Sequence, residues 1–360
     1  MSNATKQYVL NEVAYVHHNA AGEVCIFLPR EENVKFPGVN GDVILTILDI
    51  MCRPHTVGEL SKELEKTRYS VDDVDFLVDE LVSRNVLKEY SDPACLSTSL
   101  TPKQLAKYDR QLLNFAALPG NTIEDAVRQQ ERFSESSVLV IGVGGIGSYL
   151  SLGLAQIGIG TIHIVDFDEI ELSNTSRQVL YREKDVGQLK TDVALRELQQ
   201  VAPDATIVAH NCEVLSADTL NREFENVSLD LILVCADKPL GKLAHIVDEF
   251  SEATKTAILY GGPYANGKIF LGPLLLPGKT RSYSDLVPLQ SISTSDNRID
   301  RINNAHRVSA IVDTDNALAA KMMETEAIKY LGMLQEPSVV ERQIAVDTTD
   351  WSVHSGQFAQ

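Results

Sequence analysis

The alternation of apolar and polar positions divides the chain near residue 92. Before that point, "QYVLNEVAYVHHNAAGEVCIFLP" predicts two strands around an Asn-Ala-Ala-Gly turn. Helical spacing then predicts three helices, in residues 41–51, 57–66 and 71–90. Two capping-box pairs mark helix starts, Thr56 with Glu59 and Ser70 with Asp73. These elements predict a small α+β unit of winged-helix type in residues 1–92.

A second pattern begins after a polar, proline-containing boundary at residues 91–102. One short helix is expected in residues 102–115, followed by a loop. From Ser137 onward, strands alternate with helices: strands in 137–143, 160–168, 206–214 and 229–237, helices in 146–158, 187–201 and 242–254. Such alternation predicts an α/β fold, a Rossmann-like, doubly wound, mostly parallel sheet with helices on both faces. We assign it to residues 137–360, with 93–136 as linker and N-terminal helix.

Composition narrows the classes of partner. Hydrophobic residues make up 44% of the chain, enough for ordinary cores, and the formal net charge is -18 with a pI near 4.9. Such an acidic chain is a poor nucleic-acid binder, because that binding rests on Lys and Arg. The apolar run 138–165 contains a glycine cluster, Gln156 and His163, so we expect no membrane span. Scattered cysteines and the lack of a signal peptide favour a cytoplasmic location.

The first chemical motif is a glycine turn. Gly142, Gly144, Gly145 and Gly147 form a G-x-G-G-x-G pattern between a predicted strand and a predicted helix. Glycines let the backbone approach phosphates, and the helix N-terminus supplies free amides. Asp166 ends the next strand, where a carboxylate would accept hydrogen bonds from ribose hydroxyls. NAD enzymes, flavoproteins and ATP users all carry such turns, so an NAD-dependent oxidoreductase remains open at this point.

The residues after Asp166 favour a triphosphate. The segment "DFDEIELSNTSRQ" adds Asp168, Asn174, Arg177 and Gln178, and "VGQLK" adds Lys190. Two cations and an amide exceed what a diphosphate held by a glycine turn needs, but they suit attack at a triphosphate. Asp237 follows the buried run "LILVCAD", where its carboxylate can hold Mg2+. The pattern therefore predicts a site for ATP and Mg2+.

These motifs, in this order, resemble the E1-like adenylating enzymes of ThiF type, over roughly residues 107–331. The resemblance implies activation of a carboxylate by attack on the α-phosphate of ATP. By position, Asp166 matches the ribose-binding aspartate and Asp237 the metal-binding aspartate. The phosphate-contacting positions are Asn174, Arg177 and Lys190, with Gln178 beside them. "YDRQLL" resembles the family's "RYxRQ" segment, which implies that Arg110 reaches into the ATP site of a partner subunit and that the protein is a homodimer.

The chain also departs from the family pattern. Ser282 and Asp285 stand where relatives begin a structural zinc site with Cys-x-x-Cys, so we predict no zinc here. Residues 286–306 correspond to the crossover loop, whose polar side chains either orient a peptide or are merely solvated. Cys212 and Cys235 are expected to be small buried hydrophobes. Transfer of the substrate to a thioester is therefore disfavoured.

The N-terminal unit points to the substrate. Residues 41–87 resemble the PqqD-like peptide-recognition domain, in which a leader peptide pairs with a sheet edge; a DNA-binding winged helix is the alternative. The combined pattern implies ATP-dependent activation of a carboxylate, a Glu side chain, in a ribosomally made precursor peptide. Intramolecular cyclisation and dehydration would follow, as in pantocin-like antibiotic maturation. Alternatives are microcin C7-type adenylation of a peptide C-terminus, an NAD-dependent oxidoreductase, and a catalytically silent peptide-binding or sulfur-carrier partner.

Overall fold

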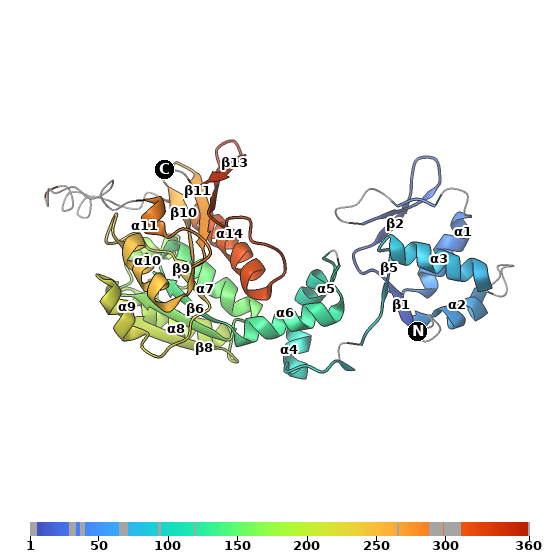
Figure 1. Cartoon of the computed structure of the whole chain (residues 1–360), viewed down its shortest axis with the longest axis horizontal. Coiled ribbons are helices and arrows are strands. Elements are labelled where there is room, and N and C mark those ends of the chain that lie inside the picture. The colour runs from blue at the N-terminus through green and yellow to red at the C-terminus, as the bar shows by residue number, and fades with distance from the viewer. Residues whose placement is uncertain are drawn as a thin grey trace. The chain divides into compact units, whose positions relative to one another are not determined.

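The computed structural model describes residues 6–28, 34–36, 40–64, 71–92, 95–118, 120–264, 266–287, 298 and 311–358, the side chains of 71–73 excepted. The chain forms two compact units, residues 1–128 and 129–360 (Figure 1). The boundary falls inside a helix rather than at the polar stretch near residue 92. Each unit has its own buried apolar core, as separate domains require.

Up to residue 92, the described part of the first unit contains two small antiparallel sheets and three helices. One sheet has the order β4-β1-β5, and the other is the hairpin β2-β3. The strands are β1 (Gln7–Leu10), β2 (Tyr15–His18), β3 (Val24–Phe27), β4 (His55–Thr56) and β5 (Leu87–Glu89). The helices are α1 (Gly41–Ile50), α2 (Val57–Leu64) and α3 (Val71–Ser83). Apolar side chains one helical turn apart, such as Ile44, Ile47 and Leu48 of α1, fill the core between them.

The predicted hairpin is present, but the sequence pattern missed three strands of this unit, β1, β4 and β5. Residues 7–10 form a separate strand, β1, and pair with β4 and β5. The predicted helix over 71–90 is wrong in its last part, because Asn85 adopts a left-handed conformation, with φ 61°. The amide of Val86 donates to the carbonyl of Leu81 at 2.8 Å, and this helix-ending turn releases residues 87–89 into β5.

The capping box predicted at the start of α2 is present. The Thr56 amide donates to Glu59 Oε2 at 2.8 Å, and the Glu59 amide donates to Thr56 Oγ1 at 3.2 Å, which confirms that capping box. The Ser70–Asp73 pair lies outside the described residues. The single helix predicted over 102–115 is wrong, because the chain bends at Tyr108 into α4 (Pro102–Lys107) and α5 (Asp109–Ala116).

The loop expected before the second pattern is also wrong, because it contains the helix α6 (Ile123–Glu135). The amide of Thr122 donates to Asp125 Oδ2 at 2.9 Å, and the amide of Asp125 donates to Thr122 Oγ1 at 3.2 Å. This capping box satisfies amides at the helix start. The buried apolar residues of α6, Ala126, Val127 and Phe133, are spaced along one face of an otherwise polar helix.

The second unit is built on one eight-stranded sheet with the order β13-β12-β11-β10-β9-β6-β7-β8. The strands are β6 (Ser137–Ile141), β7 (Thr161–Asp166), β8 (Thr206–Asn211), β9 (Leu231–Val234), β10 (Ala257–Tyr264), β11 (Lys268–Leu275), β12 (Arg342–Asp347) and β13 (Ser352–Gln357). The five strands from β10 to β8 are parallel, whereas β11, β12 and β13 continue the sheet in antiparallel order. The predicted α/β, Rossmann-like fold is confirmed, with an antiparallel extension that the sequence pattern did not indicate.

Helices cover this sheet. They are α7 (Gly145–Ile157), α8 (Lys190–Val201), α9 (Ala217–Glu223), α10 (Leu243–Thr254), α11 (Tyr283–Leu286) and α14 (Asp313–Gly332). Leu139 and Ile141 of β6 pack in one cluster with residues of α9 and α10. Helix α14 packs against α7, β10 and β11 (Figure 1). Successive strand residues point to opposite faces, so a strand covered on both faces reads as the continuous apolar run "SVLVI".

The register of the central strands places the sequence motifs at one edge. Ile141 of β6 is the register partner of both Val165 of β7 and Val234 of β9. The glycine turn, the Asp166 segment and the Asp237 segment follow these three residues directly or within three positions. Because the three strands are parallel, all three segments leave the sheet at the same edge, where ligands of such folds bind.

The short helix α11 is fixed at its start by carboxylates. Ser282 and Asp285 form a capping box, with both amide-to-side-chain distances at 3.1 Å. The buried Asp248 of α10 accepts hydrogen bonds from the amides of Tyr283 at 2.8 Å and Ser284 at 3.0 Å, and from Ser284 Oγ at 2.7 Å. Ser282 and Asp285 therefore have a role in main-chain capping. The prediction that the chain holds no zinc stays a prediction.

The described residues contain no cluster of three or more His, Cys, Asp or Glu side chains placed to ligate a metal. Nor does any described helix combine the length and the apolar character that a bilayer crossing requires.

Replacing Asp248 should test the anchoring of α11. Asp248→Ala leaves two buried or half-buried amides and a hydroxyl without their acceptor, and we expect a loss of about 2–3 kcal/mol in the free energy of unfolding. Urea unfolding followed by circular dichroism measures this loss. Glu249→Ala, at the exposed neighbouring position of α10, is the control and should change stability by less than about 0.5 kcal/mol. Equal effects of the two substitutions would contradict the anchoring role.

Candidate functional site

The glycine turn between β6 and α7 is shaped by close backbone contacts. Gly142 has φ 88°, and a Cβ on it would lie 2.8 Å from the Cβ of Ala236. A Cβ on Gly147 would lie 1.8 Å from the carbonyl oxygen of Gly142, and one on Gly145 would lie 2.5 Å from Asn316 Oδ1. Only glycine fits these positions without movement of the neighbours. The helix can therefore start directly against the end of the strand.

The first turn of α7 has no side-chain cap for its amides, because the residue before the helix is Gly144. A helix of 13 residues that begins without a cap carries unpaired amides and a partial positive charge at its N-terminus. This end of α7 lies at the edge of the sheet where the three motif segments meet, so it is suited to bind an anion.

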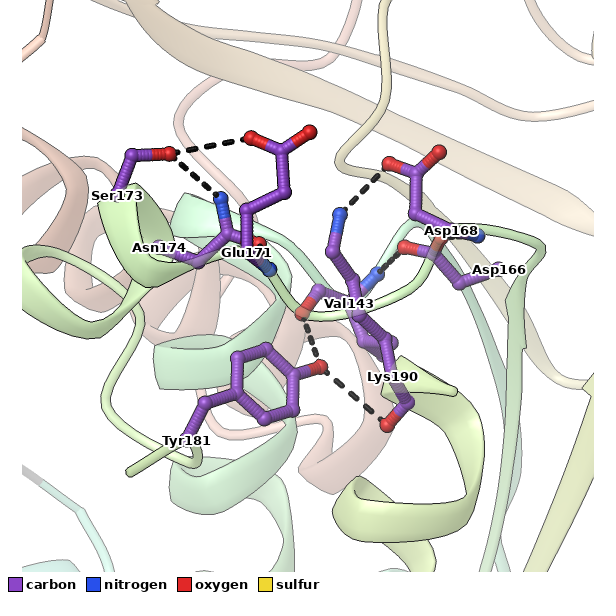
Figure 2. Close-up of polar contacts among 8 residues, drawn as sticks. All are labelled: Val143, Asp166, Asp168, Glu171, Ser173, Asn174, Tyr181 and Lys190. Atoms are coloured by element: carbon purple, nitrogen blue, oxygen red, sulfur yellow. Dashed lines mark hydrogen bonds and ion pairs between the residues drawn. The ribbon is translucent and has the colours of Figure 1, made fainter. Parts of the chain in front are cut away.

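Asp166 supports the glycine turn. One carboxylate oxygen accepts the amide of Val143 at 2.9 Å, and the other accepts the amide of Asp168 at 2.9 Å (Figure 2). A carboxylate has about four acceptor positions, so each oxygen retains capacity for a further donor such as a ribose hydroxyl. The side chain thus combines a structural contact with the position predicted for nucleotide binding.

Asp168 and Lys190 form an ion pair. Lys190 Nζ lies 2.6 Å from Asp168 Oδ2, and the Lys190 amide donates to the Asp168 carbonyl at 3.0 Å (Figure 2). The Lys190 side chain is only 7% exposed, whereas that of Asp168 is 51% exposed. The sequence-predicted cation is thus at the first position of α8, and its ammonium is held beside the Asp166 segment.

The predicted amide and guanidinium lie on the loop after β7. Asn174 is buried, and its Oδ1 accepts the Glu171 amide at 3.0 Å, so it stabilises the 3-10 turn that contains it. Arg177 is half-buried, and its Nη1 donates to the carbonyl of Ser173 at 2.5 Å. Both side chains are thus oriented by their own loop.

Gln178 shows the clearest sign of a missing partner. It is 5% exposed, and its Oε1 is buried with no hydrogen-bond donor among the described residues. Its Nε2 lies 3.7 Å from the position that a Cβ on Gly144 would occupy, which places the amide beside the glycine turn. A buried amide oxygen without a partner calls for a donor from water or a ligand.

A pocket of about 370 Å³ adjoins this amide, near the lower end of the range for ligand sites. Its lining comes from α7, the start of α14 and the loop after β7: Tyr149, Thr175, Ser176, Arg177, Gln178, Val179, Tyr181, Arg182 and Asp313. Tyr149 donates its hydroxyl to Asp313 at 2.5 Å. Burial, and then this carboxylate, raise the pKa of Tyr149 to about 12, so the phenol remains a donor.

Asp237 and Arg110 are the remaining predicted residues. Asp237 is exposed, three residues beyond the end of β9, where one carboxylate can join phosphate oxygens in holding Mg2+. Arg110 is on α5 in the first compact unit, with its side chain 86% exposed and 3.7 Å from Asp109. The part of the crossover loop at 288–305 lies outside the described residues except for Arg298.

The cysteines near the sheet are poor nucleophiles. Burial raises the pKa of Cys235, and burial followed by the charge of Glu223 raises that of Cys212. A raised pKa keeps both thiols protonated, whereas attack requires the thiolate. The prediction of small buried hydrophobes is wrong in one respect, because both residues are only partly buried.

The sequence did not point to three residues that the structure places around the turn. Tyr181 is buried and donates its hydroxyl to the carbonyl of Val143 at 2.7 Å. Asn316 contacts the position beside Gly145, and Asp313 lines the pocket. The two α14 residues lie more than 160 positions from the motif, so no local pattern could link them to it.

Comparison with known proteins decides the family. Residues 108–358 match the model of the ThiF family. The chain belongs to the ThiF family. This ThiF-family match covers α5, α6 and nearly all of the second unit.

Relatives of known name match parts of this ThiF-family chain. The adenylyltransferase and sulfurtransferase uba4 of Aspergillus niger is 33% identical over 164 residues, which cover 46% of this chain and 30% of that protein. Ubiquitin-like modifier-activating enzyme 5 of Oryza sativa is 26% identical over 215 residues, which cover 57% of this chain and 50% of that protein. The chain therefore spans half or less of the length of these two relatives.

Solved structures match over nearly the whole chain. E. coli MccB, crystallised with AMPCPP and MccA, has a TM-score of 0.77 at 23% identity, covering 98% of this chain and 97% of that chain. PaaA has a TM-score of 0.73 at 22% identity, covering 97% of this chain and 99% of that chain. These likenesses confirm the fold as that of MccB-type ThiF proteins.

The glycines of the turn should respond differently to alanine. Gly147→Ala forces a Cβ against the Gly142 carbonyl, and we expect a loss of about 1–3 kcal/mol in the free energy of unfolding. Gly144→Ala meets its nearest neighbour at 3.7 Å and should cost less than about 1 kcal/mol. Urea unfolding of both variants measures the difference. If Gly147→Ala were the milder change, the close-packing argument would fail.

Proposed function

We propose that the protein binds ATP at the edge formed by the ends of β6, β7 and β9. The unpartnered, buried amide oxygen of Gln178 beside the uncapped start of α7 is the observation that carries this proposal. Free helix amides suit phosphate oxygens, and Gln178 Oε1 suits a donor group. Asp166, with acceptor capacity left on both oxygens, suits the ribose hydroxyls. Membership of the ThiF family supports the same assignment.

The chemistry that we propose is adenylation of a carboxylate. A carboxylate oxygen forms a bond to the α-phosphorus, the bond to the bridging oxygen breaks, and pyrophosphate leaves. Arg177 and Lys190 would stabilise the negative charge that develops on the phosphate oxygens. Asp237 would hold Mg2+, which neutralises phosphate charge when bound. An NAD-dependent oxidoreductase has no comparable need for two cations near the turn.

A peptide is the substrate class that we favour for the carboxylate. Tyr15 of β2 and Phe27 of β3 are register partners and both are exposed, at 66% and 46%. Phe76 on α3 is 68% exposed in the same compact unit. Exposed aromatic side chains beside a short hairpin suit a peptide-recognition domain of the PqqD-like class. MccB, which shares the fold, was crystallised with MccA.

The activated group that we propose is a Glu side chain of a ribosomally made precursor, as in pantocin-like maturation. An internal nucleophile of the peptide attacks the acyl carbon, AMP leaves, and the chain closes to a ring with net loss of water. Proximity within one peptide favours this closure. The raised thiol pKa values of Cys212 and Cys235 favour direct closure over transfer to either cysteine. We further propose a homodimer in which the exposed Arg110 completes the partner's site.

Mass spectrometry with ATP, Mg2+ and short precursor peptides from neighbouring reading frames tests this function. We expect one peptide to lose 18 Da, with release of AMP and pyrophosphate. The loss should disappear when its core Glu is replaced by Gln and persist when its C-terminus is amidated. The opposite result would assign adenylation to the C-terminus. Leader binding without nucleotide consumption by any peptide would contradict enzymatic activation.

The two cations should matter for rate rather than for folding. We expect Arg177→Ala and Lys190→Ala each to slow peptide-dependent exchange of labelled pyrophosphate into ATP about 100- to 1000-fold, or about 3–4 kcal/mol. Arg222→Ala is the matched control, because Arg222 of α9 also donates to a carbonyl four residues earlier. Its rate should stay within about twofold of wild type. A loss below about tenfold at Arg177 or Lys190 would make the assignments wrong.

A further inference from the structure

A closed circuit of contacts surrounds the glycine turn (Figure 2). Asp166 binds the Val143 amide of the turn and the amide of Asp168. Asp168 binds Lys190 at the start of α8 through both its side chain and its carbonyl. Tyr181 lies between the two ends of this chain of contacts. Its hydroxyl is 2.7 Å from the carbonyl oxygen of Val143 and 3.4 Å from that of Lys190.

Tyr181 thus completes the links among four separate segments. They are the glycine turn, the end of β7, the first residue of α8, and the loop that carries Arg177 and Gln178. Both polar groups of Val143 are fixed, the amide by Asp166 and the carbonyl by Tyr181. Because Val143 is fully buried, water does not replace either partner.

We propose that Tyr181 is a positioning residue, whose hydroxyl holds the glycine turn and the start of α8 at the spacing required for one ligand to contact both. The proposal rests on the nucleotide site of the proposed function. Tyr181 acts through main-chain carbonyls, while the groups on the ligand side are the amides of the turn and the ammonium of Lys190. Its ring is 1% exposed, so packing fixes the direction of the hydroxyl.

The state of the phenol suits this role. Burial, and then the negative charges of Asp166 and Asp168, raise the pKa of Tyr181 well above 10. The hydroxyl therefore remains a donor over the whole working range of pH. A phenol has one proton to donate, so the short bond to Val143 dominates and the longer contact with Lys190 is secondary.

The test compares two buried tyrosines. Tyr181→Phe keeps the ring and removes the hydroxyl. Tyr260→Phe removes a hydroxyl of the same kind, which donates to the Ala244 carbonyl at 3.1 Å from a ring that is also buried. Hydrogen exchange of the full chain without nucleotide should become at least about fivefold faster in residues 138–147 and 186–196 in Tyr181→Phe alone. Unchanged exchange in both segments, or equal acceleration in Tyr260→Phe, would overturn the proposal.

Nucleotide affinity provides the second measurement. Calorimetric titration with AMPCPP and Mg2+ should show about tenfold weaker binding by Tyr181→Phe, equivalent to about 1.4 kcal/mol. Tyr260→Phe should bind AMPCPP with an affinity within about twofold of wild type, even if its melting temperature falls as far as that of Tyr181→Phe. Equal affinity of Tyr181→Phe and wild type would overturn the positioning role. If wild type itself does not bind AMPCPP, the proposed function fails, while hydrogen exchange still decides whether Tyr181 holds the two segments.

Discussion

The contact between Gly147, the fourth glycine of the turn, and the strand end is the constraint on which the candidate site depends. With 1.8 Å between a hypothetical Cβ on Gly147 and the carbonyl oxygen of Gly142, α7 can approach β6 only if position 147 has no side chain. That approach sets where the free amides of α7 lie. The segments after β7 and β9 emerge beside them because the strands are parallel and in register. Packing at one glycine thus positions charged groups from three parts of the chain.

The acidic residues near this turn hold neighbouring segments of the protein together. Asp166 holds the amides of Val143 and Asp168, and Asp168 holds Lys190. Their types and positions could be predicted from the sequence, because a carboxylate after a parallel strand lies at the binding edge. Their hydrogen-bond partners could not, since those depend on how the loop folds back toward α8. The same holds for Tyr181, whose place in the apolar stretch "VLY" suggests only a core residue.

The fold was predictable where the run of apolar residues was continuous. Strands such as "SVLVI" and "LILV" read clearly because both faces are buried. Other elements could not be predicted, for reasons that differ from one element to the next. Asn85, with its left-handed φ, ends a helix whose apolar spacing continues past it, and the polar helix α6 carries few of the apolar positions by which helices are recognised. Strand β11 pairs with β10, and β13 with β12, in local hairpins, and the Asn266-Gly267 turn of the first is a signal that the sequence reading missed. Only the pairing of β11 with β12 joins distant segments, for which the local pattern contains no signal.

The ion pair between Asp168 and Lys190 implies selectivity by charge. At 2.6 Å from a carboxylate, the ammonium is already neutralised, so an incoming anion must compete with a counterion that belongs to the protein. When a singly charged ligand binds, Lys190 only exchanges one anionic partner, Asp168, for another. A polyanion can draw on the helix amides and Arg177 together with Lys190, and these added attractions offset the cost of displacing Asp168. In the proposed nucleotide site, Asp168 would therefore compete with the ligand for Lys190, and ligands of higher negative charge would be favoured.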